Sequence, residues 1–454
     1  MRVAIRVPGW PTQPRWCCMV VCGFWPWHGD CGYQSTLFWS TQPTMPKKNA
    51  AARTALPKPG VRLELLTARR NARMARSAHA YVRGNTTRFY EWLDSIENHA
   101  LPEGPAVWIC GDCHAGNLGP VANAQGRVEI QIRDLDQTVI GNPAHDLIRL
   151  GLSLATAARG SDLPGVTTVH MMEALADGYE RAFDDTSDHT DIQAEKPEAV
   201  RVVMREALRR SWQELAEERI EDVEPQIPLG KRFWPLSKSE RREIAALFEK
   251  RTVARLATEL RSEDEAAKVT VFDAAYWVKG CSSLGRLRYA VLLDVDGAAL
   301  DGDDLCLIDI KEAVQAAAPR YAGVSMPRDN AQRVVEGARH LAPFLGDRMR
   351  AARLAKRSVV IRELLPQDMK LTIEQLTRDE AMKAARFLAL VVGKAHARQM
   401  DDIERKAWLG ELRRRRSKTL DAPPWLWKSI VELVSGHEAG YLEHCRRYSL
   451  EAGA

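Results

Sequence analysis

The stretch from residue 107 to residue 146 constrains the fold most strongly, because it places acidic side chains at the end of a predicted strand. Its first residues, Val107–Cys110, form a short apolar run that predicts a buried strand. Apolar and polar residues alternate from Val128 to Ile132, which predicts a half-buried strand leading directly to Asp134 and Asp136. We therefore expect adjacent strands whose ends present carboxylates to a common site.

The residue types at these strand ends suit the binding of a divalent cation. Mg²⁺ prefers oxygen ligands and keeps water and phosphate oxygens in its coordination shell. Asn117, Asp134 and Asp136 are therefore the predicted metal ligands. Asp112 is predicted not to coordinate the metal ion. Its predicted role is that of the catalytic residue, which orients an attacking hydroxyl. The alternative is a strand–turn–strand hairpin in which these side chains make only turn hydrogen bonds.

Two segments of this stretch, GDCHAGNLG and IRDLDQTVIGNPAHDLIRL, resemble the phosphate-transfer core of aminoglycoside phosphotransferases and other kinase-like enzymes. The spacing from Asp112 to Asn117 is similar to that of a kinase catalytic loop, and Asp134 lies where a kinase places its magnesium-binding Asp. From about Ala72 to Met400 the chain also resembles a bacterial family known only as a domain of unknown function. The resemblance implies a site that uses ATP and Mg²⁺, and it gives Asp146 the structural role of accepting backbone N–H bonds from the catalytic loop.

A β-rich pattern begins at Lys268 and predicts three strands, at 269–278, 286–294 and 305–310. Between the first two lies a loop with Gly280, Ser283 and Gly285, and the third ends at Lys311. This is the order of a kinase N-lobe, in which the loop's backbone N–H groups cover phosphates and the Lys reaches their oxygens. Because Ser282 stands where kinases usually have their middle Gly, a plain β-hairpin remains the alternative.

A helix predicted at 330–345 carries Glu336. A Lys at the end of so apolar a strand requires an anionic partner, and we expect Glu336 to pair with Lys311 as in the Lys–Glu ion pair of kinases. An exposed helical Glu is the alternative.

The predicted parts follow one another in an order that differs from that of ordinary kinases. Gly280, Lys311 and Glu336 come after Asp112, which indicates a circular permutation with new ends between the helix at 378–399 and Asp112. The predicted fold class is α+β, a two-lobed protein-kinase-like fold with a small antiparallel β lobe and a larger, mostly helical lobe. The chain is predicted to begin with a disordered or mis-started extension at 1–59, followed by a catalytic part at 60–265. A nucleotide-binding β part at 266–370 and C-terminal helices at 371–454, which return to the large lobe, complete the predicted order.

Composition narrows the class of partner. The net charge of +5 is mild for 454 residues and does not indicate a nucleic-acid-binding protein. No apolar run approaches the length of a membrane span, and scattered cysteines favour the cytoplasm. The oligomeric state stays open.

The leading prediction is therefore an ATP- and Mg²⁺-dependent phosphotransferase that acts on a small molecule. Two alternatives remain, a metal-dependent phosphoesterase and a catalytically inactive, nucleotide-binding pseudokinase. The roles of Arg83 and His114 are not assigned, although Arg83 could contact a phosphate or pair with a carboxylate.

Overall fold

The computed structural model of this chain divides into two units, Met1–Thr54 and Ala55–Ala454, and only the second contains described residues. The described residues are 56–96, 100–161, 163–184, 196–209, 226–259, 268–281, 283–295, 305–369, 371, 377–417 and 422–448. Most of the predicted N-terminal extension, and Ser282 in the predicted glycine loop, therefore lie outside them. The second unit has a mixed α+β architecture with antiparallel sheets.

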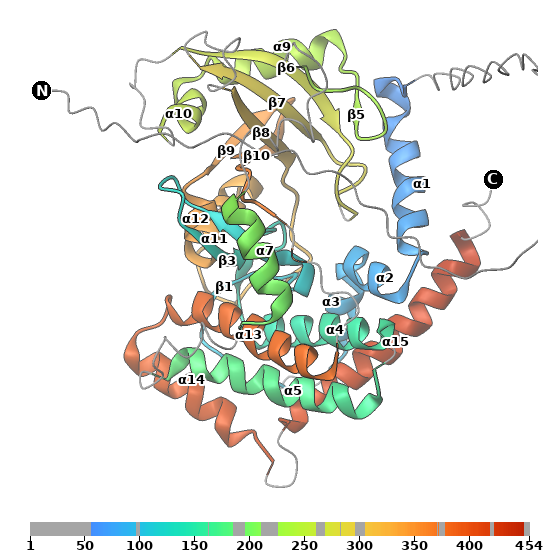
Figure 1. Cartoon of the computed structure of the whole chain (residues 1–454), viewed down its shortest axis with the longest axis vertical. Coiled ribbons are helices and arrows are strands. Elements are labelled where there is room, and N and C mark those ends of the chain that lie inside the picture. The colour runs from blue at the N-terminus through green and yellow to red at the C-terminus, as the bar shows by residue number, and fades with distance from the viewer. Residues whose placement is uncertain are drawn as a thin grey trace, which may run out of the picture. The chain divides into compact units, whose positions relative to one another are not determined.

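A six-stranded antiparallel sheet forms one region of this unit (Figure 1). Its strands, in spatial order, are β5 (Phe233–Trp234), β6 (Val269–Trp277), β7 (Arg288–Val295), β8 (Leu305–Glu312), β10 (Arg357–Glu363) and β9 (Met349–Leu354). The three strands predicted from the β-rich pattern are β6, β7 and β8. Strand β10 was predicted to start at Ser358, whereas β9 was missed because its sequence, MRAARL, lacks a clear alternation.

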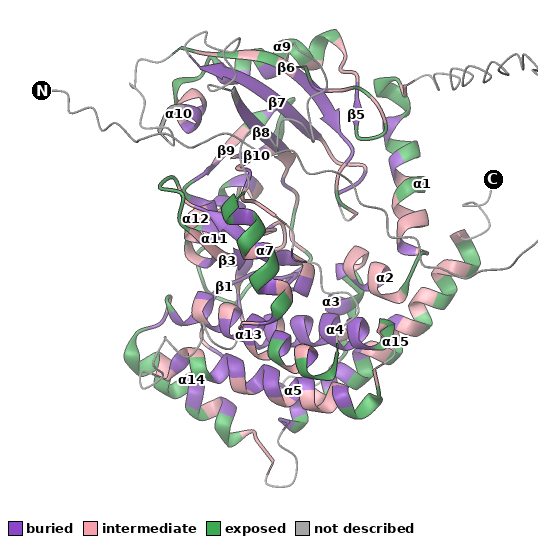
Figure 2. Cartoon of the chain, viewed as in Figure 1, coloured by how far each residue is buried: buried purple, intermediate pink, exposed green. Residues whose placement is uncertain are grey.

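Both faces of the central strand β7 are buried. Tyr289, Val291 and Leu293 pack into one apolar cluster, whereas Ala290 and Leu292 pack into another on the opposite face. Successive side chains of a strand point to opposite faces, so an apolar run without polar breaks belongs in the middle of a covered sheet. Helices α9 (Lys238–Phe248) and α10 (Arg251–Glu259) contribute to the first cluster and cover that face (Figures 1 and 2).

The other region is mostly helical and holds the largest apolar core. Its helices are α3 (Thr86–Ser95), α4 (Ala144–Gly160), α5 (Gly165–Glu180), α7 (Glu198–Arg209), α13 (Arg378–Ala397), α14 (Asp402–Arg414) and α15 (Pro424–Tyr448). α13 packs along α5 and α15 along α4, so the C-terminal helices join the region formed by residues 86–180. None of the described helices is both long and apolar enough to cross a membrane.

Four helices connect the regions. Helix α11 (Asn330–Leu341) and the following α12 (Pro343–Gly346) lie between β8 and β9 in sequence, and α11 contacts β9 and β10. α1 (Arg62–Met74) and α2 (Ala78–Gly84) run from the sheet region to the helical region. Ser77 accepts a hydrogen bond from the Ala80 backbone N–H and is the N-cap of α2.

The two strands predicted around the acidic motifs do not pair with each other. β1 (Val107–Ile109) pairs with β4 (Val139–Gly141), and β3 (Val128–Ile132) pairs with β2 (Leu118–Ala122). The acidic residues therefore lie on the segments between two small antiparallel sheets. Short strands alternate too weakly in sequence to identify their partners, which is why the expected pairing was wrong.

Two glycines allow α5 and α13 to pack closely. A Cβ atom built at Gly178 would lie 2.1 Å from the backbone oxygen of Arg386, and one built at Gly393 would lie 2.6 Å from the Cβ of Ala182. No side chain fits at those distances, so both positions require glycine.

We expect Gly178→Ala to lower the free energy of unfolding by about 1–3 kcal/mol, because the new methyl group must push the two helices apart. Urea denaturation measures the change. Gly410→Ala in α14 is the matched control, since no described atom lies within 4 Å of a Cβ built there. The control should stabilise the protein by up to about 1 kcal/mol. Equal effects of the two substitutions would show that the helices do not depend on this close approach.

Candidate functional site

Asp146, on the first turn of α4, holds the loop that follows β1. Its carboxylate accepts hydrogen bonds from the backbone N–H groups of Cys110, at 2.6 Å, and Gly111, at 2.9 Å. His396 of α13 contacts the same carboxylate at 3.2 Å through Nε2. Gly111 has a φ of 74°, and a Cβ there would lie 2.2 Å from a backbone oxygen. The predicted structural role of Asp146 is confirmed.

Asp112 lies on this loop, but its carboxylate is engaged by Arg149. Nε of Arg149 donates to Oδ1 of Asp112 at 2.9 Å, and both residues are buried. Burial raises the pKa of Asp112, and this effect outweighs the opposing charge of Arg149. Asp112 is not one of the described residues that line the two pockets discussed below. Its predicted catalytic role stays a prediction.

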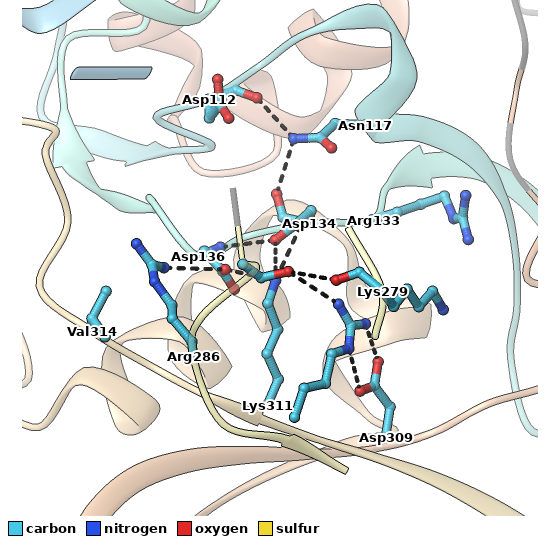
Figure 3. Close-up of polar contacts among 12 residues, drawn as sticks. Asp112, Asn117, Arg133, Asp134, Asp136, Lys279, Arg286, Asp309, Lys311 and Val314 are labelled. Atoms are coloured by element: carbon cyan, nitrogen blue, oxygen red, sulfur yellow. Dashed lines mark hydrogen bonds and ion pairs between the residues drawn. The ribbon is translucent and has the colours of Figure 1, made fainter. Parts of the chain in front are cut away.

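Asn117 connects the loop to the acidic motif that follows β3. Its Nδ2 donates to the backbone oxygen of Asp112 at 2.8 Å and to that of Asp134 at 3.5 Å (Figure 3). Because the nitrogen of the amide serves these bonds, the oxygen Oδ1 is the atom of Asn117 suited to a metal ion.

The Lys311 ammonium, at the end of β8, lies between two carboxylates (Figure 3). It is 3.1 Å from Oδ1 of Asp134 and 2.6 Å from Oδ2 of Asp136. The Lys311 side chain is only 13% exposed, so it requires such partners. Sequence analysis placed Lys311 and the acidic pair in one site, and the structure brings them together although 177 positions separate Lys311 from Asp134.

The two carboxylates differ in their pKa. Burial raises the pKa of Asp134, but Lys311, with the more distant Arg288 and Arg362, outweighs burial and holds it well below the usual range. Burial and the neighbouring Asp134 charge raise the pKa of Asp136. Asp134 is therefore the permanent anion of the pair, and at 41% exposure it is also the more accessible one.

The structure does not bring Glu336 to Lys311. Glu336 instead contacts Arg339, at 3.3 Å, and His340, at 3.9 Å, within its own helix α11. Two physical reasons explain the difference: the Lys311 charge is already compensated by two carboxylates, and α11 turns Arg333 toward the acidic motif. The guanidinium of Arg333 donates to the backbone oxygens of Asp136, at 3.0 Å, and of Thr138.

The predicted glycine loop connects β6 to β7 and is tightly folded. Gly280 and Gly285 have φ values of 85° and 93°, in the left-handed region that favours glycine. Ser283 is buried and donates to the backbone oxygen of Lys279 at 3.1 Å. Gly280 and Ser283 line a pocket, whereas a Cβ at Gly285 would face Leu63 of α1.

Two pockets meet at Asp134. The first, of about 470 Å³, has an apolar side formed by Val334, Leu345, Met349 and Val360. Its charged side includes Arg133, Asp134, Asp136, Arg288, Asp309, Lys311, Arg362 and Asp368. The second, of about 460 Å³, is lined by Arg73, Arg76, Ala80, Arg83, His114, Asn117, Asp134, Gly280, Cys281, Ser283 and Arg288. Both have Arg83, Asn117, Asp134, Gly280 and Arg288 in their walls.

Sequence reasoning missed an ion-pair network behind Lys311. Asp309 of β8 is 2% exposed and accepts two hydrogen bonds from Arg288, at 2.9 and 2.5 Å, and one from Arg362, at 3.1 Å. Burial raises the pKa of Asp309, but these two guanidinium groups outweigh it and hold the pKa well below its usual range. A signal was present, because an Asp inside the apolar run LCLIDI must find cationic partners.

His114 lies in the wall of the second pocket and is 5% exposed. Its Nδ1 atom is buried and has no hydrogen-bond partner among the described residues. Burial, together with the charges of Arg83 and Arg149, holds the pKa of His114 well below its usual range. The imidazole is therefore neutral at neutral pH.

This lowered pKa makes stability depend on pH. The unfolded chain binds the His114 proton more readily, so the stabilisation is present above about pH 6.5 and is lost as the pH falls below it. We expect His114→Asn to reduce the loss of unfolding free energy between about pH 7 and pH 5, measured by urea denaturation. His145→Asn should act likewise, because burial lowers the pKa of His145 to about 4. An unaltered pH dependence in the His114 variant would contradict a lowered pKa.

Comparisons with known proteins place the chain in a family but do not give it an activity. No curated protein and no solved structure matches the chain. A family model described as an uncharacterised protein conserved in bacteria, DUF2252, matches residues 62–447. That match covers most of the chain and contains all the site residues described above. The chain therefore belongs to the DUF2252 family of uncharacterised proteins conserved in bacteria.

Proposed function

We propose that this protein is an ATP- and Mg²⁺-dependent phosphotransferase with a circularly permuted kinase-like fold, acting on a small molecule. The observation that carries the proposal is the contact of Lys311 with Asp134 and Asp136, at 3.1 and 2.6 Å. In kinases a Lys on the β-sheet contacts the phosphate oxygens of ATP, and an Asp opposite it binds the Mg²⁺ that bridges the phosphates.

The topology of the six-stranded sheet supports the proposal. A glycine-containing loop joins β6 to β7, Lys311 lies on the next strand β8, and helix α11 follows before β9 and β10. Protein kinases have their phosphate-covering loop, their Lys on the third strand and a following helix in this sequence. The displaced Glu336 is the departure from that pattern, and Asp136 takes its place as a partner of Lys311.

The packing of α13 supports the permutation. Gln399, just after α13, accepts from the Trp108 backbone N–H at 2.8 Å and donates to the Trp108 backbone oxygen at 3.0 Å. The end of this helix therefore lies beside β1, the strand that leads to Asp112. In ordinary kinases a comparable helix leads into the catalytic loop, so joining these two points and opening the chain elsewhere restores the kinase order.

The donor atoms fit the proposed ligands. Asn117 and Asp134 offer hard oxygen donors, and the lowered pKa of Asp134 keeps it anionic, as Mg²⁺ requires. Bound Mg²⁺ would neutralise phosphate charge during transfer. The apolar side of the first pocket, with Val334, Met349 and Val360, suits a purine ring, while Lys311 faces the phosphates.

In the proposed reaction an acceptor hydroxyl oxygen forms a bond to the γ-phosphorus, and the bond from that phosphorus to the β–γ bridging oxygen breaks. Asp112 takes the hydroxyl proton in this proposal. Its raised pKa suits a base, but its contact with Arg149 favours a second candidate, a nucleotide-binding protein without transfer activity. A phosphoesterase with two metals fits less well, because the Lys311 ammonium lies between the carboxylates.

We expect titration calorimetry to detect binding of ATP that depends on Mg²⁺. Asp134→Asn should weaken apparent Mg²⁺ affinity at least about tenfold, because it removes a charged metal ligand. Asp136→Asn should have a smaller effect, since Asp136 is less exposed and contacts Lys311. Asp402→Asn, at an exposed position of α14, is the matched control. ATP binding that is equally strong without Mg²⁺ would contradict the proposed metal site.

Asp112→Asn should lower the slow hydrolysis of ATP, with water as acceptor, by about a hundred- to ten-thousandfold while ATP affinity is retained. A coupled assay for ADP measures the rate, and calorimetry measures the affinity. Because Arg149 loses a charged partner, thermal unfolding must first show that the variant is folded. A folded variant with wild-type turnover would exclude Asp112 as the base, and a wild type without turnover would favour the nucleotide-binding candidate.

A further inference from the structure

The second pocket adjoins the first at Asp134, whereas the apolar residues Val334, Leu345, Met349 and Val360 are among the described lining residues of the first alone. Three segments form it: the end of α1 with α2, the loop after β6, and the loop that carries Asp112 and Asn117. It therefore opens beside the position at which the proposed phosphate chain would end. A phosphate acceptor has to approach from such a position, in line with the bond that breaks.

The charge of this pocket is strongly positive. Arg73, Arg76 and Arg83 line it, and all three come from the segment of α1, α2 and their connection. Arg288 also lines it, but its charge is compensated by Asp309 at 2.5 Å. Among the described lining residues the carboxylate is that of Asp134, which Lys311 already pairs. The described wall therefore carries more guanidinium groups than carboxylates.

The arginine-bearing segment is held in place at several points. Arg62, at the start of α1, forms an ion pair with Glu240 of α9 at 2.6 Å. Arg73 donates to the backbone oxygen of Gly280, and Tyr441 of α15 donates to that of Ala75 at 3.1 Å. The Arg83 guanidinium packs over Gly116, where a Cβ would lie 3.0 Å from its Cζ. These contacts hold Arg73, Arg83 and the backbone of the segment in place before any ligand binds, which lowers the entropic cost of binding.

His114 gives independent evidence for a ligand. Its Nδ1 atom is buried, lies in a residue that is 5% exposed, and has no hydrogen-bond partner among the described residues. A buried polar atom of this kind costs free energy unless a ligand or water satisfies it. The same residue is among those that line the arginine-rich pocket.

We infer that this pocket binds the acceptor of the phosphotransferase, and that the acceptor is a small molecule carrying an anionic group, a phosphate or a carboxylate, beside its hydroxyl. Guanidinium groups match both anions in shape and charge. The role of the bound molecule as phosphate acceptor rests on the proposed function, whereas the existence of the anion site does not.

The test uses the full chain and inorganic phosphate as the probe, with affinity measured by titration calorimetry in the absence and in the presence of saturating ADP and Mg²⁺. We expect Arg73→Gln and Arg76→Gln, at arginines that are among the described lining residues of the second pocket but not of the first, each to weaken phosphate binding about tenfold or more. Arg205→Gln, an exposed arginine of α7, is the control and should bind like the wild type. Lys311→Met should also retain phosphate binding. Arg76 is itself exposed, so its variant is expected to fold, as circular dichroism can verify.

The outcomes separate this inference from the proposed function. Phosphate binding that is lost with ADP or in Lys311→Met, but kept in the arginine variants, would place the anion in the nucleotide site and overturn the inference. A wild type that does not bind phosphate would overturn it as well. Arginine-dependent phosphate binding in a protein that binds neither ADP nor ATP would uphold the anion site while refuting the phosphotransferase.

A competition experiment tests whether the molecule bound in this pocket must carry an anionic group. Glycerol 3-phosphate and glycerate should compete with inorganic phosphate, whereas glycerol should not, because it lacks the charge that the arginines recognise. Competition by glycerol that equals that of glycerol 3-phosphate would contradict an anionic acceptor.

Discussion

The ammonium of Lys311, shared by two carboxylates, is the interaction on which the rest of the site depends. It joins the six-stranded sheet to the loop after β3, at distances of 3.1 and 2.6 Å. The two carboxylates share the Lys311 ammonium, and Arg286 lies 3.9 Å from Asp136 as a further cation. Burial and the neighbouring Asp134 charge raise the pKa of Asp136. In the proposed function, a metal ion would bind at Asp134 and a phosphate would contact Lys311.

Arginines surround this centre and divide into two groups. Arg288 and Arg362 are paired with Asp309, and Arg348 is paired with Asp368 at 2.8 Å, so these side chains connect strands and loops. Such buried pairs fix geometry more than they add stability, because desolvation cancels much of the attraction. The arginines of α1, α2 and their connection line the second pocket, and Arg83 among them also lines the first. Pairing with Asp309 and Asp368 thus marks the arginines that connect strands and loops.

The sequence predicted the elements of the fold better than their pairing. Local patterns identified β6, β7, β8 and the start of α13 at Thr377, whose side chain accepts from the Glu380 backbone N–H. The strands around the acidic motifs were predicted, but their partners were wrong, because three- and five-residue strands carry too little alternation to specify a register. A buried Lys311 was correctly expected to need an anionic partner, but the expected partner was Glu336, whereas the structure has Asp134 and Asp136. The predicted Lys311–Glu336 pair did not form. The pocket-lining positions of Arg73 and Arg76 were not predicted, because the sequence pattern of an arginine is the same whether its side chain faces water or a pocket.

The hydrogen bond between His396 and Asp146 has a consequence for how the protein is made. Asp146 anchors the loop of Cys110 and Gly111, and its partner His396 follows 250 positions later. Ribosomes add about 5–20 residues per second, so the loop and its anchor wait roughly 12 to 50 seconds for α13 to be synthesised. During that time the apolar surfaces of α4 and α5 that α13 will cover are exposed on the nascent chain.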